Sequence, residues 1–229
     1  MSTYIENKFI SKSWLSSLSV GCIAALSGIT GPVLFLSIIT IAELLQYGYD
    51  RIRETISMLV LGPYGWLVTV GFFLFGFLFI VFTLRLYSVV NKTLSSRIGI
   101  ILLGLVGLGF FLVGIFPTQA PDTTLKLHAL IHKQTAGAMS LLFSLACLAL
   151  ALGFRRDPRW KKLWLYTLIT GSVTLILIIV AVPVASDWGW KGLHERVLLI
   201  SGLVWTTVIA VRLIAACLHE RRKLSTLAY

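Results

Sequence analysis

Two closely spaced histidines are the residues of this sequence that most clearly suggest chemistry. His128 and His132 are four positions apart, so in a helix both imidazoles project from the same side. The same helical row continues through small side chains, Ala136, Ser140 and Ser144. This row either leaves space for a pocket beneath the histidines or forms a seam against which a neighbouring helix packs closely.

A histidine pair at this spacing is one way in which a helix binds zinc. His194, Asp122 or Glu195 would supply the third ligand, and a carboxylate would activate water. The sequence has no HExxH motif and offers no cysteine ligand beside these residues, so we assign no metal ligand and expect no cofactor. A haem bound by two histidines needs ligands on opposing helices. Only His194 and His132 could provide them, so haem is disfavoured further.

The arginines in the same segments suit an anionic or polar ligand. Arg51 and Arg196 carry guanidinium groups, which bind a phosphate or carboxylate through two parallel hydrogen bonds. The alternative is an ion-pair network in which these arginines, Asp122 and Glu195 tie the loops together. The candidate ligand-binding residues are therefore Arg51, Asp122, His128, His132, His194, Glu195 and Arg196.

The composition shows what kind of element must position these residues. Hydrophobic residues make up 57% of the 229 residues and charged residues 13%, whereas soluble domains contain about 25% charged residues. This excludes a soluble domain of this size and a disordered chain. Three cysteines are too few for a disulfide-stapled secreted scaffold, and we expect Cys22, Cys147 and Cys217 to be buried apolar residues with no external disulfide. An integral membrane protein remains.

Six long apolar stretches can each cross a bilayer, which needs about 20 apolar residues in a helix. We predict an all-α fold, a polytopic bundle of six transmembrane helices that forms a single transmembrane domain over residues 1–229. Pro32 is expected to bend the first helix, and Glu54 to Leu61 to form an interfacial or re-entrant piece. The predicted spans are about 14–42, 66–86, 98–116, 131–154, 163–183 and 195–218, with short cytoplasmic tails at 1–12 and 219–229.

Six spans place both termini on one side of the membrane. The segments on that side hold fourteen of the twenty basic residues and three of the nine acidic ones, so they carry the whole net charge of +11. By the positive-inside rule this side is cytoplasmic. The excess charge is thus a topology signal that matches the anionic inner leaflet, and we expect no nucleic-acid partner.

Six motif residues occur in pairs before the second span, after the third and at the start of the sixth: Ser57, Leu59, Phe116, Pro117, Gly192 and Arg196. Together they resemble the family of bacterial and archaeal membrane proteins known as domain of unknown function 998, over residues 21–211. In that family the motifs read Ile-Ser-x-Leu, Phe-Pro-x-Asp followed by a histidine, and Gly-x-x-x-Arg. Gln119 stands where the family has its aspartate, and Asp122 follows three residues later. The resemblance implies a fold without a known reaction, and it adds Ser57 to the candidate ligand-binding residues.

A looser similarity links the chain to the eukaryotic FGF-receptor-activating and damage-regulated autophagy modulator membrane proteins. These proteins have a comparable number of spans and a phenylalanine shortly before a histidine that opens a helix. The similarity implies lipid handling.

We expect a multi-pass protein of the cytoplasmic (plasma) membrane, with both termini in the cytoplasm, that binds a lipid head group or small polar ligand in a pocket on the extracytoplasmic face. Binding without chemistry is favoured over an enzyme. Two alternatives stay open: a membrane-embedded zinc-dependent lipid hydrolase, similar in logic to the alkaline ceramidase-like proteins, and a structural or accessory subunit of a membrane complex. The expected partner is the lipid bilayer, including a specific lipid, and nothing in the sequence indicates whether the chain forms a homo-oligomer.

Overall fold

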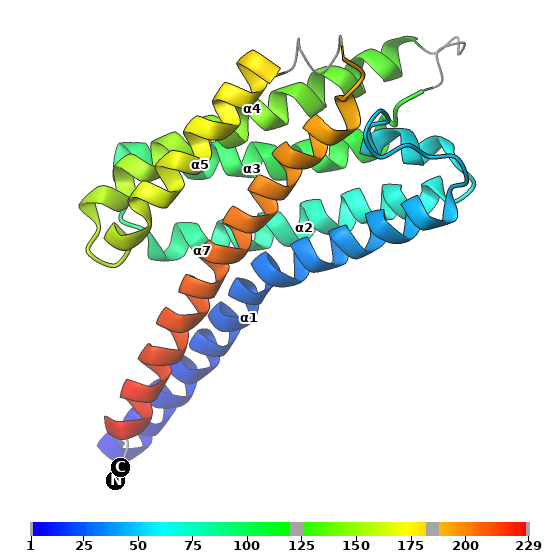
Figure 1. Ribbon diagram of the computed structural model, residues 1–229. Helices are drawn as coiled ribbons and strands as arrows, with labels where there is room; N and C mark the ends of the chain where they lie inside the picture. The colour runs from blue at the N-terminus through cyan, green and yellow to red at the C-terminus, as the bar shows by residue number, and fades with distance from the viewer. Residues whose placement is uncertain (1, 120–125, 182–187, 228–229) are drawn as a thin grey trace.

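The structure is a computed structural model that describes residues 2–119, 126–181 and 188–227. Every regular element within these ranges is helical (Figure 1). Segments η1 and η2 are 3₁₀-helices and η3 is a π-helix. The elements are α1 (Ser2–Leu45), η1 (Ile56–Leu61), α2 (Gly65–Val89), α3 (Leu94–Ile115), α4 (Lys126–Arg156), η2 (Lys161–Leu163), α5 (Trp164–Ile176), η3 (Leu177–Ala181) and α7 (Lys191–Leu227).

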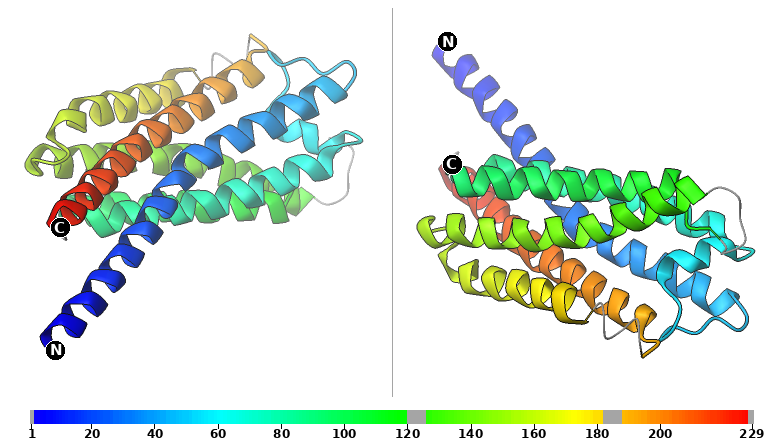
Figure 2. Two further views of the ribbon diagram at one scale, coloured as in Figure 1. Left: turned by 90° about the horizontal axis from the view of Figure 1, so that it is seen from below. Right: turned by 90° about the horizontal axis from the view of Figure 1, so that it is seen from above.

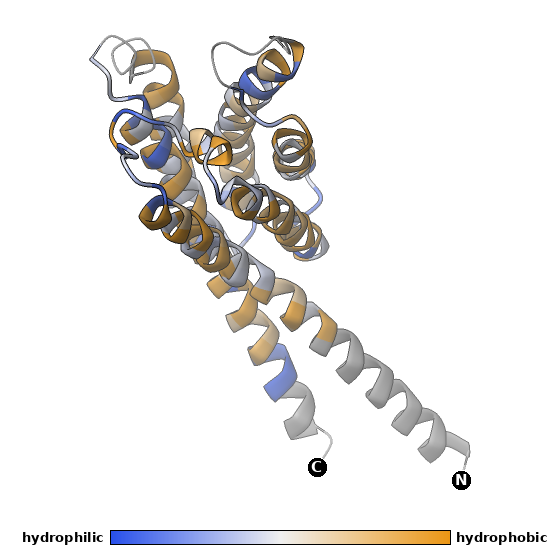
Figure 3. Ribbon diagram, turned by 90° about the vertical axis from the view of Figure 1, so that its right-hand side faces the viewer, coloured by the Kyte–Doolittle hydropathy of each residue, from blue (hydrophilic) through white to orange (hydrophobic). Residues whose placement is uncertain are grey.

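The lengths and compositions of these helices match a membrane-spanning protein. Six helical stretches among the described residues are long and apolar enough to cross a bilayer, each with a mean hydropathy of 2.1 or more. Hydrophobic residues dominate their length, and hydrophilic residues lie mainly toward the helix ends and in the loops (Figure 3). The stretches are Val20–Leu45, Gly65–Val89, Leu94–Ile115, Leu127–Arg156, Lys161–Val180 and Lys191–Arg222. The structure therefore confirms the predicted all-helical fold with six candidate spans.

Helices that follow one another in the sequence pack side by side. α1 packs on α2, α2 on α3, α3 on α4 and α4 on α5, and α7 returns to pack on α1 (Figure 2). α5 and α7 contact each other far less, so the seam between them is the most loosely packed side of the bundle. We call the end of the bundle that carries η1 and the start of α7 the outer end, because the charge pattern predicts that it faces away from the cytoplasm.

Phenylalanine rings fill much of the centre of the bundle. Phe72, Phe75 and Phe79 recur in α2 at intervals of three and four residues, so they share one face of that helix. Phe75 stacks on Phe35 of α1 with ring centroids 4.9 Å apart, and it meets Phe110 of α3 edge-on at 4.7 Å. Such pairs contribute about 0.5–1.5 kcal/mol each beyond the burial of their surface. The rings thus join α1, α2 and α3 at the centre of the fold.

Several local features of the helices bear on the expectations from the sequence. α1 runs without interruption through Pro32 and changes direction along its length (Figure 1). The 3₁₀-helix η1 occupies most of the piece predicted to be interfacial. α4 begins at Lys126, so His128 and His132 share one helix, as their spacing predicted. α1 and α7 continue as helices through the segments expected to be short tails.

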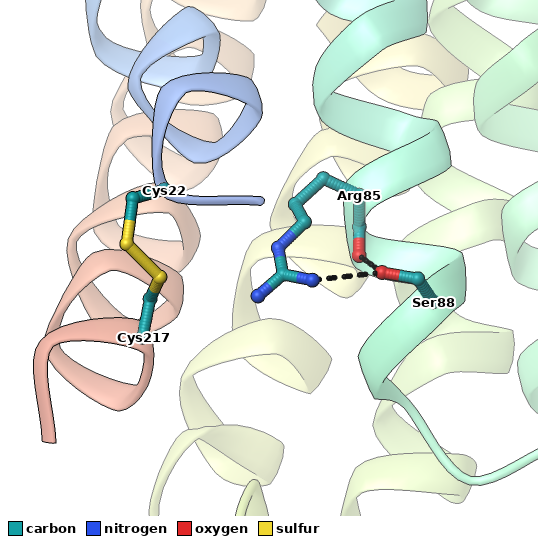
Figure 4. Close-up of a disulfide and its surroundings, with 4 residues drawn as sticks. All are labelled: Cys22, Arg85, Ser88 and Cys217. Carbon is teal, nitrogen blue, oxygen red and sulfur yellow. Dashed lines mark hydrogen bonds between the residues drawn. A yellow bond between two sulfur atoms is a disulfide. The ribbon is translucent and has the colours of Figure 1, made fainter. Parts of the chain in front are cut away.

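The expectation that all three cysteines are simply buried apolar residues is wrong for two of them. Cys22 of α1 and Cys217 of α7 form a disulfide, with their Cα atoms 5.8 Å apart (Figure 4). Cys147 is a free, buried thiol, as expected. The pairing is hidden in the sequence because 195 positions separate the two partners, and they meet only because α7 returns to α1.

Candidate functional site

A buried ion pair joins two helices that are far apart in the sequence. Glu43 lies near the end of α1 and Arg196 near the start of α7. Arg196 donates hydrogen bonds to Glu43 Oε1 from Nη2 at 2.5 Å and from Nε at 3.2 Å. The Glu43 side chain is only 7% exposed and that of Arg196 15%, so little water screens the pair. This contact fastens α7 to α1 at the outer end.

The remaining N–H groups of Arg196 are occupied by oxygens of the same chain. Nη1 donates to the carbonyl oxygens of Arg51, Glu54 and Gly192 at 2.8, 3.0 and 3.0 Å. Nη2 also donates to the Tyr49 hydroxyl at 2.7 Å. All five N–H groups of the guanidinium therefore have acceptors within the chain, and none is left for the phosphate or carboxylate of a ligand.

The Gly-x-x-x-Arg motif has a direct physical basis. Gly192 and Arg196 are four residues apart, so they lie on the same face of α7. A Cβ atom at Gly192 would lie 2.6 Å from the carbonyl oxygen of Arg51 and closer still to that of Glu54. The glycine thus lets the loop approach the helix, and the arginine one turn later binds the same two carbonyls.

Arg51 and Tyr49 complete this cluster. Arg51 Nε lies 3.0 Å from Glu43 Oε2, and its side chain is 54% exposed. The Tyr49 hydroxyl donates to the carbonyl oxygen of Thr55 at 2.8 Å. Burial raises the pKa of Tyr49 to about 12, although the hydrogen bond from Arg196 acts in the opposite direction. We call Glu43, Tyr49, Arg51 and Arg196 the outer network.

Glu195 faces a different side of α7 from Arg196, because successive residues of a helix are about 100° apart. Its Oε2 accepts a hydrogen bond from the backbone N–H of Ile56 at 2.6 Å. Ile56 is the first residue of η1, where N–H groups have no partner within the helix. Glu195 also lines a cavity inside the bundle, together with Ser57 of η1.

His132 lines the same cavity from α4 and is buried. Its Nδ1 lies 2.8 Å from the carbonyl oxygen of Phe116. A carbonyl oxygen only accepts, so Nδ1 carries the hydrogen and, in the neutral ring, Nε2 is an acceptor. The His128 ring meets the Phe116 ring edge-on, with centroids 5.2 Å apart. Both histidines of the pair therefore contact the phenylalanine of the Phe-Pro motif.

The cavity has a volume of about 140 Å³ and is lined by residues of η1 and of all six long helices. An apolar cavity of similar volume holds a molecule the size of benzene. Between Glu195 and Thr206, which both line the cavity, α7 rises about 16 Å at 1.5 Å per residue. The lining therefore extends along α7, with the ionisable residues His132 and Glu195 toward the outer end. Its aromatic wall consists of Phe35, Phe72, Phe75, Phe79, Phe110 and Phe143.

The helical row that follows His132 serves both of the roles that the sequence suggested. Ala136 and Ser140 line the cavity. Ser144 is buried against α5, and its hydroxyl donates to the carbonyl oxygen of Gly171 at 2.8 Å. The row is thus a cavity wall near the outer end and a packing seam further along.

His194 ties the start of α7 to the end of α5. Its Nε2 donates to the carbonyl oxygen of Leu177 at 3.1 Å. Leu177 is the first residue of the π-helix η3, and π-helical turns occur frequently at functional sites. The histidine acts across the loosely packed seam and is not among the residues that line the cavity.

Seven of the eight candidate residues fall into three groups, and the eighth, Asp122, lies outside the described residues. No three histidine, cysteine, aspartate or glutamate side chains are grouped as metal ligands anywhere in the part of the chain that the structure describes, so nothing there supports a zinc hydrolase. The groups are the cavity residues Ser57, His132 and Glu195, the outer-network residues Arg51 and Arg196, and the helix-contacting residues His128 and His194.

Three parts of this site were missed in the sequence: Glu43, Tyr49 and the aromatic wall. Glu43 had a signal, because the apolar run continues to Leu45 and the acid therefore falls inside the helix. The phenylalanines of α2 had one too, because their three- and four-residue spacing places them on one face. Tyr49 lies in a loop and had no comparable signal.

Comparisons with known proteins bear on most of the chain. No curated protein and no solved structure matches it. A family model described as "Protein of unknown function (DUF998)" matches residues 29–212, a range that includes the outer network and every residue that lines the cavity. The chain therefore belongs to this family, as its three motifs predicted.

Proposed function

We propose that the protein binds an amphipathic lipid at the outer end of the bundle, with its polar head group beside Ser57, His132 and Glu195 and only a short segment of its apolar chain, as much as about 140 Å³ admits, among the phenylalanines. The cavity is the observation that carries this proposal, because it combines an aromatic wall with Ser57, His132 and Glu195. Binding sites for small molecules typically pair apolar walls with a few well-placed polar groups. A bound lipid would suit a role in lipid handling, transport or sensing.

The polar end of the cavity favours a head group that donates hydrogen bonds. Nε2 of neutral His132 is an acceptor, because Nδ1 donates to Phe116. In its ionised form Glu195 accepts from Ile56 through Oε2, and Oε1 is a second acceptor. The N–H groups of Arg196 all donate to acceptors within the chain. We therefore favour a head group that bears a hydroxyl or an amine over a phosphate.

The loosely packed seam between α5 and α7 supports a lateral route into the cavity. Thr174 of α5 and Leu198, Leu199 and Gly202 of α7 all line the cavity. Because these two helices contact each other far less than the helix pairs that pack side by side, we expect a lipid to separate them more easily than any of those pairs. The ligand would then come from the surrounding leaflet rather than from water.

The predicted orientation makes this the outer leaflet of the cytoplasmic membrane. The turn between α4 and α5 carries Arg155, Arg156, Arg159, Lys161 and Lys162. Such basic turns stay on the cytoplasmic side. His132 and Glu195 line the cavity near the opposite ends of their helices, so the proposal places these groups near the extracytoplasmic face and both termini in the cytoplasm.

Filling the cavity tests the proposal. Ala136 lines the cavity, whereas Ala138 is exposed on the same helix, so Ala136→Leu and Ala138→Leu form a matched pair. Lipid retained by the purified variants is measured by native mass spectrometry, and thermal unfolding shows that both variants fold. We expect Ala138→Leu to keep the lipid that the wild type keeps and Ala136→Leu to lose most of it. Equal retention by the two folded variants would contradict the proposal.

The head-group preference is tested at Glu195. In Glu195→Gln the amide oxygen still accepts from Ile56, but the second oxygen is replaced by a donor. Retention of lipids whose head groups carry hydroxyls or amines should fall relative to other lipids of the same chain length. An unchanged head-group profile would show that the cavity selects for the apolar chain alone.

A further inference from the structure

Arg85 lies at the end of the membrane span opposite to the outer network. α2 begins at Gly65, beside η1 at the outer end. From Gly65 to Arg85 the helix rises about 30 Å, which is the thickness of the hydrocarbon core. Arg85 therefore lies level with the head groups of the other leaflet, which the charge pattern predicts to be the cytoplasmic one.

The guanidinium of Arg85 lies against the backbone of α1. Gly21 is buried, and a Cβ atom there would lie 2.9 Å from Arg85 Cζ. Figure 4 shows the side chain extending from α2 toward α1, beside the Cys22–Cys217 disulfide. The absence of a side chain at Gly21 thus creates the space that the guanidinium occupies, and the disulfide holds α1 in place on α7.

Arg85 has fewer hydrogen-bond partners than Arg159 and Arg196. Its Nη1 donates to Ser88 Oγ at 3.1 Å, and the Ser88 hydroxyl donates in turn to the Arg85 carbonyl at 2.7 Å. Its Nε is buried and has no acceptor. By contrast, Arg159 pairs with Asp157 at 3.0 Å and Arg196 pairs with Glu43. No carboxylate of the described residues pairs with Arg85.

A partly buried charge without a counter-ion is costly, and an anionic partner from outside the chain would offset that cost. We propose that Arg85, with Ser88 beside it, binds the phosphate of an anionic phospholipid in the cytoplasmic leaflet. A guanidinium is suited to phosphate because it offers two parallel N–H donors. The cytoplasmic leaflet is rich in anionic lipids, which makes a lipid the natural source of that phosphate. This site is separate from the cavity and does not depend on the proposed function.

The proposal is tested by lipid titration of the whole detergent-solubilised protein, followed by native mass spectrometry. Phosphatidylglycerol is the probe, phosphatidylcholine of the same chain length is the comparison, and inorganic phosphate is a third arm. Arg85→Gln removes the charge, and Arg97→Gln is the matched control, because Arg97 is exposed near the same end of the bundle. Thermal unfolding shows whether each variant is folded.

Loss of one charge-assisted contact should weaken binding of phosphatidylglycerol by about tenfold in Arg85→Gln and by less than about twofold in Arg97→Gln. Gly21→Ala should weaken it as well, because the new methyl group would push the guanidinium aside without changing any charge. Equal losses in the two arginine variants would overturn the proposal in favour of general surface charge. Millimolar inorganic phosphate is the remaining arm of the test. If it displaces the lipid from the wild type but has no such effect on Arg85→Gln, the phosphate site is supported, with free phosphate rather than a lipid as its ligand.

Discussion

Replacing Arg196 by glutamine should destabilise the protein more than any other single change at the outer end. The substitution leaves Glu43 buried, with a side chain only 7% exposed, and removes both hydrogen bonds to its Oε1. Breaking a buried ion pair by removing one partner costs about 3–5 kcal/mol. Arg51 still reaches Oε2 at 3.0 Å, so we expect the lower end of this range, about 3 kcal/mol.

The assay is reversible unfolding of the detergent-solubilised protein by sodium dodecyl sulfate, followed by tryptophan fluorescence. Arg53→Gln is the control, because Arg53 is 79% exposed and lies 3.6 Å from Asp50, so its loss should change the free energy of unfolding by less than about 1 kcal/mol. In the double variant with Glu43→Gln the loss should be clearly smaller than the sum of the single losses. A change below about 1 kcal/mol in Arg196→Gln, or additive losses in the double variant, would refute the reasoning.

Three further outcomes follow from the same contacts. Gly192→Ala should destabilise the protein by about 1–3 kcal/mol in the same assay, because its methyl group would meet the backbone carbonyl of Glu54; wild-type stability would show that the loop can move away. Burial raises the pKa of Tyr49 to about 12, so its protonated hydroxyl stabilises the fold up to about pH 10, and this stability is lost as the pH rises from about 10 through about 12. Tyr49→Phe should remove this part of the alkaline pH dependence of unfolding. Replacing Cys22 and Cys217 together by serine should lower the free energy of unfolding by about 2–4 kcal/mol, and dithiothreitol should do the same to the wild type but not to the variant.

The spans were predictable because each is a local property of the chain. A helix in a bilayer satisfies its own backbone hydrogen bonds, so a long apolar run is sufficient to indicate it. The placement of His128 and His132 on one helix was predictable for the same reason, since a four-residue spacing needs no knowledge of other helices. The Phe-Pro and Gly-x-x-x-Arg motifs were visible as well, although their contacts were not.

The contacts between distant helices could not be predicted from one sequence. Arg196 seemed available for a ligand, but it bonds to Glu43, which lies 153 positions earlier. Its neighbour Glu195 seemed to belong to the same cluster. Successive helical residues point about 100° apart, however, so Glu195 faces the cavity and Arg196 faces the loop. The Cys22–Cys217 pair was hidden because only the return of α7 to α1 brings the two thiols together.

The joining of α1 to α7 also bears on how the protein is assembled during synthesis. The chain enters the membrane from its N-terminus, so α1 is in place long before α7 is made. Until then, the buried carboxylate of Glu43 lacks Arg196, and Cys22 lacks its disulfide partner. A nascent chain that stops before α7 would leave both groups unmatched at opposite ends of the same candidate span, Val20–Leu45. Insertion of α7 is therefore the step that satisfies both groups and closes the bundle on α1.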